Sequence, residues 1–135
     1  MYQQMIFVNL ATNDVAASRK FFTELGYSIN PQFSTDDCSC VVISDTIIAM
    51  LLSKQRYADF TKKEIADSTK TSEVLICLSA ESREKVDELV EKAVAAGGTA
   101  NEDVQDQGFM YGRSFEDLDG HSWEVVWMDP AAVQG

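Results

Sequence analysis

The chain has 135 residues, 45% of them apolar, which is typical of one ordinary globular domain. Its formal net charge of -11 argues against nucleic acid or an anionic membrane as a partner, because proteins bind such polyanions through clustered lysine and arginine. No apolar run approaches the roughly 20 residues that cross a bilayer, and no basic region precedes the short apolar run near Met1, so we expect a soluble, cytoplasmic protein.

The three cysteines are an odd number, which predicts free thiols rather than a disulfide framework. Cys38 and Cys40 form a C-x-C pair on an apolar run. No other pair of cysteines or histidines with zinc-ligand spacing accompanies them. We therefore interpret them as small core side chains.

The first half of the chain predicts one strand, one helix and three further strands. Residues 6–11 form a β-rich run, and Asn13 or Asp14 then offers a side-chain oxygen to cap a helix that ends at Gly26. β-branched and apolar runs separated by turn residues follow, which predicts strands over 27–33, 39–44 and 46–52.

A polar, charged segment over residues 53–71 follows the first half. Tyr57, Phe60 and Ile65 within it predict a short amphipathic helix that leads into a loop. We interpret this segment as a linker.

The second half repeats the order of the first. An apolar strand over 73–79 precedes a helix that begins at Ser82 and ends at Gly97 and Gly98. Asp119 and Gly120 belong to the last hairpin turn. The remaining strands are predicted over 100–104, 109–116 and 121–128.

The sequence thus predicts an α+β fold of two βαβββ modules, residues 1–52 and 72–135. The repeat is roughly 65 residues long and occurs only twice, whereas a solenoid uses shorter repeats in at least three copies. We expect the modules to pair into one pseudo-symmetric domain over 1–135, with a concave cleft between the sheets and the helices outside.

Two segments resemble the vicinal oxygen chelate superfamily, which includes glyoxalase I, the bleomycin-resistance proteins and the extradiol dioxygenases. The first is the pattern N-D-V-x-x-S-x-x-F-F-x-x-L-G-Y over residues 13–27. The second, more specific, is FMYGRSFEDLDGHSWEV over 109–125, which is similar to the closing hairpin of the family. The resemblance covers nearly the whole chain and implies the same paired fold.

Metal-dependent members of that family place one ligand on the first and the last strand of each module. The resemblance carries those four positions onto Phe7, Met50, Leu75 and Glu124. Only Glu124 offers a ligand for a divalent cation, because Phe, Leu and Met supply at most a soft thioether. We therefore expect no metal and no other cofactor. His121, the single histidine, falls outside this set and is interpreted as a solvated turn residue.

Glu124 is the candidate catalytic residue, and its carboxylate is expected to point into an apolar cleft. Such a group needs a partner, and Arg113, Tyr111 and Asn9 are the candidates. In a functional interpretation Glu124 is a general base or a hydrogen-bonding anchor for a ligand. In the alternative it is an inert family remnant paired to Arg113. Phe7, Asn9, Met50, Leu75, Tyr111 and Arg113 complete the predicted ligand-binding set.

The leading functional hypothesis is binding of a small, partly apolar molecule, with or without metal-independent chemistry at Glu124. The alternatives are a metal-dependent lyase, isomerase or dioxygenase, and a protein that sequesters a drug or toxin without turnover. The family resemblance also implies a homodimer. The sequence names no ligand and leaves open whether any reaction is catalysed, because a fold alone does not fix a function.

Overall fold

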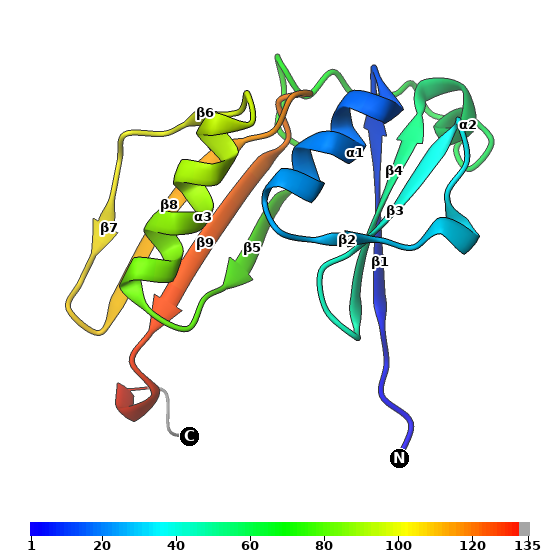
Figure 1. Ribbon diagram of the computed structural model, residues 1–135. Helices are drawn as coiled ribbons and strands as arrows, with labels where there is room; N and C mark the ends of the chain where they lie inside the picture. The colour runs from blue at the N-terminus through cyan, green and yellow to red at the C-terminus, as the bar shows by residue number, and fades with distance from the viewer. Residues whose placement is uncertain (133–135) are drawn as a thin grey trace. The chain divides into compact units, whose positions relative to one another are not determined.

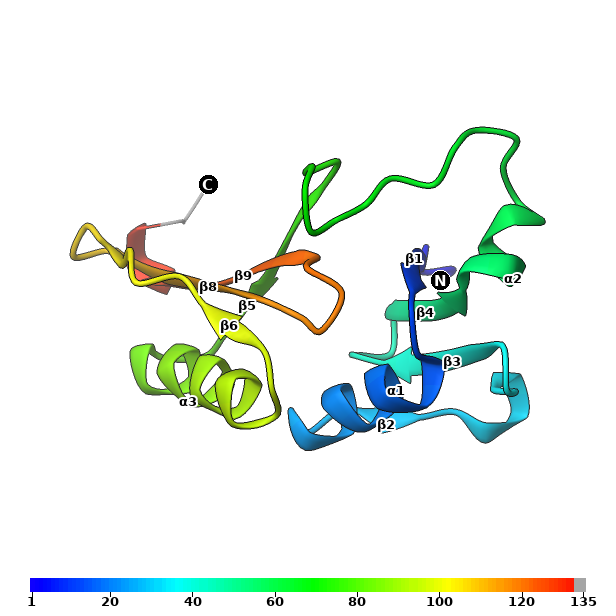
Figure 2. The same ribbon diagram turned by 90° about the horizontal axis from the view of Figure 1, so that it is seen from above.

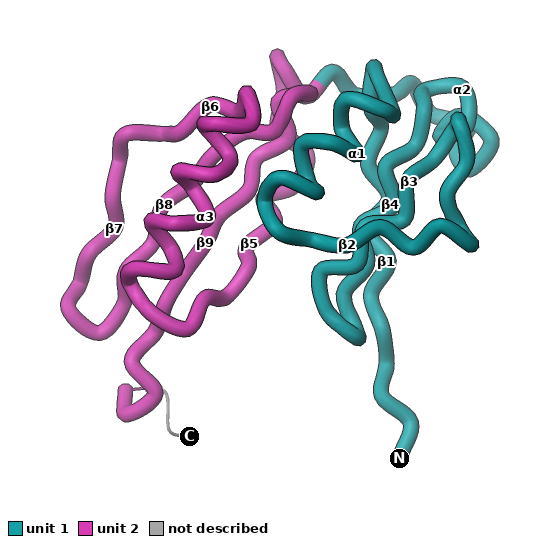
Figure 3. Tube along the Cα trace, viewed as in Figure 1, with its two compact units in different colours: residues 1–67 teal, residues 68–135 magenta. Residues whose placement is uncertain are grey.

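A computed structural model describes residues 1–132 of the chain. The chain divides into two compact units, Met1–Asp67 and Ser68–Gly135, coloured separately in Figure 3. Each unit has its own sheet and its own long helix, as Figure 1 shows. The pairing of the two modules around a cleft stays a prediction.

Unit 1 contains the four-stranded sheet A, in the order β1-β4-β3-β2. β1 runs parallel to β4, and the other neighbouring strands are antiparallel. The elements are β1 (Ile6–Thr12), α1 (Val15–Glu24), β2 (Ser28–Ile29), the 3-10 helix η1 (Pro31–Phe33), β3 (Cys38–Val42), β4 (Ile47–Ser53) and α2 (Lys54–Ala58).

Helix α1 begins and ends where the sequence predicts. Asp14 is its N-cap, because its extended backbone lets the carboxylate accept a 3.0 Å hydrogen bond from the amide of Ala17. Phe21 and Phe22 are buried beside each other, with ring centroids 5.0 Å apart. Gly26 follows the helix at φ +106, a conformation that glycine adopts without strain.

Unit 2 contains sheet B, in the order β5-β9-β8-β6, with β7 also paired to β8. β5 runs parallel to β9, and β8 and β9 form an antiparallel hairpin. The elements are β5 (Leu75–Ser79), α3 (Arg83–Ala95), β6 (Thr99–Ala100), β7 (Gln105–Asp106), β8 (Met110–Glu116), β9 (Ser122–Met128) and the 3-10 helix η2 (Pro130–Ala132).

Helix α3 covers one side of sheet B, as Figure 2 shows from above. The hydroxyl of Ser82 caps the helix by accepting a 3.1 Å hydrogen bond from the amide of Lys85. Val86, Val90 and Ala93 are fully buried at helical spacing. The side chain of Trp123 is 1% exposed, and its ring stacks on that of Phe115.

The β-α-β-β-β order is confirmed in unit 1, whereas four strands, β6 to β9, follow helix α3 in unit 2. Three local predictions are wrong. Residues 31–33 form η1 instead of continuing a strand, because Pro31 lacks a backbone N–H and Asn30 caps the turn. The strand predicted over 100–104 is interrupted, since the Asn101 side chain bonds the amide of Asp103. The linker helix covers only residues 54–58.

Within residues 1–132, no helix is both long enough and apolar enough to span a membrane.

Candidate functional site

The two surfaces of sheet B differ in chemistry, and the strand register assigns each residue to one of them. Side chains alternate along each strand, and paired residues on neighbouring strands share a face. Trp123 and Val125 face α3. The far face of sheet B, turned away from α3, consists of Leu75, Cys77, Ser79, Thr99, Gln105, Met110, Gly112, Ser114, Glu116, Ser122, Glu124, Val126 and Met128.

Glu124 occupies the middle of this far face, in one row across three strands. Its register partners are Cys77 on β5 and Ser114 on β8. The side chain of Glu124 is half-buried, and no other residue of the described chain donates a hydrogen bond or an ion pair to its carboxylate. Partial desolvation, and secondarily the Glu124 charge, raises the pKa of the Cys77 thiol. The row therefore presents an unpaired carboxylate next to a protonated thiol.

Tyr111 and Arg113 lie on the opposite face of the sheet from Glu124. The Tyr111 hydroxyl donates a 2.7 Å hydrogen bond to Asp87 on α3, and Arg113 donates a 3.0 Å ion pair to the same carboxylate oxygen. These two contacts, that of Tyr111 first, hold the pKa of Asp87 below its usual range. The predicted pairing of Glu124 with Arg113 or Tyr111 is therefore wrong, and both side chains leave the predicted ligand-binding surface.

In sheet A, the predicted residues Phe7, Asn9 and Met50 share the face turned away from Leu10 and Leu51. Asn9 is the direct register partner of Met50, and Phe7 lies two residues earlier on the same strand face. Phe7 is 55% exposed, Asn9 is exposed and Met50 is half-buried. Each of the three is available to a ligand on the surface of its own sheet.

The position of Leu75 on β5 of sheet B corresponds to the position of Phe7 on β1 of sheet A. Leu75 lies two residues before Cys77 on the far face and is 61% exposed. The residue level with Glu124 is Cys77, which the predicted binding set omitted. A shift of two positions keeps a side chain on the same strand face, so sequence alternation assigns the face but not the row.

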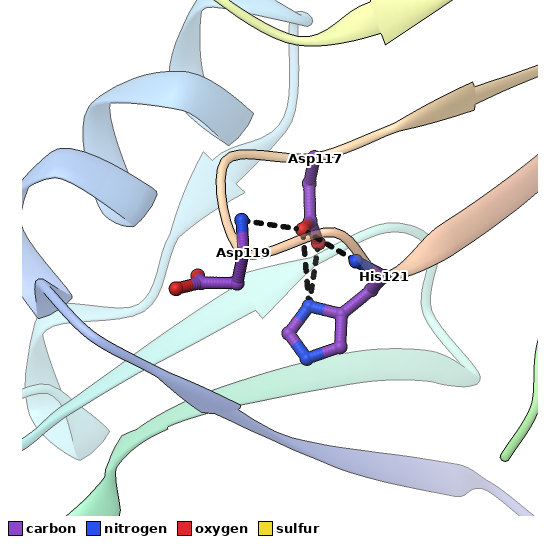
Figure 4. A group of neighbouring side chains, drawn as sticks. All are labelled: Asp117, Asp119 and His121. Atoms are coloured by element: carbon purple, nitrogen blue, oxygen red, sulfur yellow. Dashed lines mark hydrogen bonds and ion pairs between the residues drawn. The ribbon is translucent and has the colours of Figure 1, made fainter. Parts of the chain in front are cut away.

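The turn between β8 and β9 holds a cluster of three titratable side chains, Asp117, Asp119 and His121, drawn in Figure 4. Asp117 Oδ1 accepts hydrogen bonds from the backbone amides of Asp119 and His121, both at 3.0 Å. Its Oδ2 lies 2.8 Å from Nδ1 of His121 and accepts a 3.0 Å bond from the indole of Trp123. His121 is only 9% exposed, so the prediction of a solvated turn histidine is wrong.

A metal-ligand role for this cluster conflicts with its hydrogen bonding, although its potential ligand atoms lie within 4.8 Å of one another. Both oxygens of Asp117 already accept N–H donors, so the side chain anchors the turn. The Nδ1 atom of His121 lies 3.0 and 2.8 Å from the two oxygens of Asp117, so this ring nitrogen already has a partner within the turn. We therefore interpret the cluster as structural. The Asp-to-His spacing of four residues across a tight turn is the sequence signal for it.

Comparison with known proteins agrees with this architecture. Residues 4–44 match the family described as bleomycin resistance protein-like N-terminal. A structure of a hypothetical protein from S. aureus is 29% identical, with 94% of each chain covered and a TM-score of 0.78. No curated protein matches the chain at a significant level.

Two further structures have the same fold at lower identity. A glyoxalase/bleomycin resistance protein/dioxygenase family enzyme from Burkholderia phytofirmans is 17% identical over 93% of this chain and 99% of its own, with a TM-score of 0.76. Lactoylglutathione lyase from Agrobacterium tumefaciens is 16% identical over 93% of this chain and 94% of its own, with a TM-score of 0.68.

The chain therefore has the α+β fold of the glyoxalase and bleomycin-resistance proteins. Together with the N-terminal family match, this fold confirms the resemblance to the vicinal oxygen chelate superfamily that the sequence predicted.

The donor set of this chain does not fit the metal centre that the superfamily implies. Of the four positions, Phe7 and Leu75 carry no donor atom and Met50 carries only a thioether. Glu124 alone offers oxygen, whereas catalytic divalent sites use three protein ligands of the carboxylate or imidazole type. A shift of two positions along the same strands, from Phe7 to Asn9 and from Leu75 to Cys77, still supplies no histidine.

Proposed function

We propose that this protein binds a small, partly apolar molecule on the far face of sheet B, with Glu124 as the anchor. One observation carries the proposal: the Glu124 carboxylate lies between Cys77 and Ser114 without a hydrogen-bonding partner in the described chain. A hydrogen bond from a ligand to a half-buried acceptor without a partner contributes favourably to the free energy of binding.

Apolar side chains flank the row on the same face and would contact the body of the ligand. Leu75 lies on one side, and Val126 and Met128 lie on the other, with Met128 46% exposed. In sheet A, Phe7, Asn9 and Met50 stay predicted ligand-binding residues on the surface of their own sheet. The name of the Burkholderia phytofirmans relative, which joins enzymes with a resistance protein, leaves both catalysis and sequestration compatible with this site.

Metal-independent chemistry at Glu124 is the second candidate, because an unpaired carboxylate is free to accept a proton from a bound ligand. The metal-dependent lyase, isomerase and dioxygenase alternatives are disfavoured by the donor set.

The test is ligand-induced thermal stabilisation across a library of small apolar and amphipathic molecules. A molecule that binds only the folded state raises the midpoint of unfolding by mass action. We expect hits that stabilise the wild type and lose most of their effect in Glu124→Gln. Glu91→Gln is the matched control, since Glu91 is an exposed residue of α3 and its change removes the same charge.

Absence of any stabilising molecule would contradict the proposal, as would hits that are unaffected by Glu124→Gln. Turnover of a hit by the wild type but not by Glu124→Gln would assign it to an enzyme rather than to a sequestering protein.

A further inference from the structure

The charge of the chain is concentrated in unit 2. Residues 68–135 contain 14 of the 22 acidic residues but only 5 of the 11 basic ones, which places a formal charge of -9 out of -11 there. Such a field attracts cations and repels anions before any specific contact forms. The uneven charge distribution therefore favours a positively charged ligand for unit 2 over a negatively charged one.

Among the described residues, the far face of sheet B carries no cationic side chain to oppose its two carboxylates, Glu116 and Glu124. Both arginines of unit 2 are committed elsewhere. Arg113 binds Asp87 on the helix side. Arg83 binds Asp106 at 2.8 and 3.0 Å and lies over the rings of Tyr111 and Trp127. No arginine therefore neutralises Glu124 from within unit 2.

The two neighbours of Glu124 in its row are uncharged. Cys77 is exposed, partial desolvation raises the pKa of its thiol, and Ser114 carries a hydroxyl. Met110 and Val126, together with Leu75, add apolar surface on either side of the row. The face thus offers the Glu124 carboxylate at its centre and Glu116 near the β8–β9 turn, among mostly apolar and neutral side chains.

We infer that the ligand is an amphipathic organic cation, with a protonated amine that donates to Glu124 and an apolar body that lies along β8 and β9. This inference rests on the proposed function and names the chemical class that the same site takes. Repulsion by Glu124 weakens the binding of a carboxylate or phosphate ligand, and a neutral ligand lacks the charge-assisted hydrogen bond.

Three probes with one ring system test the inference: 1-naphthylmethylamine, 1-naphthylmethanol and 1-naphthoate. Affinities are measured by calorimetry, and binding is located by NMR shifts of the β8 and β9 amides. We expect the wild type to bind the amine about five- to tenfold more tightly than the alcohol, because a half-exposed ion pair contributes about that much to affinity. Naphthoate should bind most weakly of the three. Added salt should reduce the amine preference.

Two variants separate a local contact from general acidity. In Glu124→Gln the amine and the alcohol should bind about equally, while Glu91→Gln should keep the amine preference of the wild type. Equal wild-type affinity for amine and alcohol at β8 and β9 would overturn the inference but leave the proposed function standing. An equal loss of preference in both variants would overturn it too. No shift at β8 and β9 with any probe would contradict the proposed function itself.

Discussion

The indole Nε1 of Trp123 donates a 3.0 Å hydrogen bond to Oδ2 of Asp117, which ties the β8–β9 turn to a residue of the core. The same carboxylate holds two backbone amides of the turn and the ring of His121. One buried side chain thereby fixes the hairpin that positions Glu124.

Removing this anchor should destabilise the protein strongly. We expect Asp117→Ala to lower the free energy of unfolding by about 3 kcal/mol, because several buried donors lose their acceptor at once. Asp117→Asn should cost less, since one oxygen remains to accept the turn amides. Denaturant unfolding measures both variants. An Asp117→Ala protein as stable as the wild type would show that the turn does not depend on the carboxylate.

Gly120 should tolerate no side chain. Its φ is +85, and an added Cβ would lie 2.9 Å from the carbonyl oxygen of Ser68. We expect Gly120→Ala to lower the free energy of unfolding by about 2 to 4 kcal/mol, from backbone strain plus the clash. Gly26→Ala is the matched control, because Gly26 has φ +106 but nothing within 4 Å of its added Cβ. Equal losses in the two variants would mean that the contact with Ser68 is unimportant.

Asp87 should contribute to the acid limb of the stability curve. The hydrogen bond from Tyr111, and then the contact with Arg113, lowers its pKa in the folded state. The unfolded state therefore binds more protons, so the contribution is complete above the unfolded carboxyl pKa of about 4 and is lost as the pH falls through the lower folded value. We expect Asp87→Asn and Tyr111→Phe to be less stable than the wild type at pH 7.

The two variants should also lose stability less steeply than the wild type on acidification. Unfolding free energies measured between about pH 6 and pH 2 give this slope, the window being set by ordinary carboxyl pKa values. An unchanged acid slope in Asp87→Asn would contradict the role assigned to this carboxylate.

Cys77 should report the charge of Glu124. Partial desolvation and then the Glu124 carboxylate raise the pKa of its thiol, and only the thiolate reacts with alkylating agents. We expect Glu124→Gln to lower that pKa toward its usual value and so to accelerate alkylation of Cys77 near neutral pH. Peptide mass spectrometry after iodoacetamide treatment follows Cys77 separately from Cys38 and Cys40. Alkylation at the wild-type rate in Glu124→Gln would argue against close contact of the two side chains.

Chelation should leave the protein unchanged. Since Glu124 is the only oxygen donor among the four superfamily positions, we expect EDTA treatment to leave the midpoint of thermal unfolding within the error of the measurement. Metal analysis of the untreated protein is the companion measurement. A stoichiometric transition metal whose removal lowers the midpoint would revive the metal-dependent alternatives.

Local features of the fold were predictable because they depend on residues close together in the sequence. Asp14 and Ser82 cap helices through amides three residues away, and Gly26 and Gly97 end helices in the positive-φ conformation. The failures at Pro31 and Asn101 are also local. Each arose because a short polar contact or a missing N–H competed with strand formation.

The site was predictable only in part. The family resemblance led to Glu124, and the alternation of side chains along β9 places Trp123 and Val125 on the other face. Tyr111 and Arg113 were misplaced because alternation within β8 yields two sets of side chains without saying which one faces the helix. The five-residue turn fixes that choice, since it pairs Ser114 with Glu124 and Arg113 with Val125.

The sequence by itself determined the βαβββ order of the first module, the ends of the two long helices, the resemblance to the superfamily and the shortage of metal ligands at the positions that this resemblance implies, since all of these are recorded in residue type and spacing. The tertiary structure decided which groups meet. Asp87 reaches Tyr111 and Arg113 across 24 and 26 residues, and Cys77 reaches Glu124 only through the parallel pairing of β5 with β9. Such partners are set by the pairing register and by helix packing, which depend on how the whole unit buries its apolar surface.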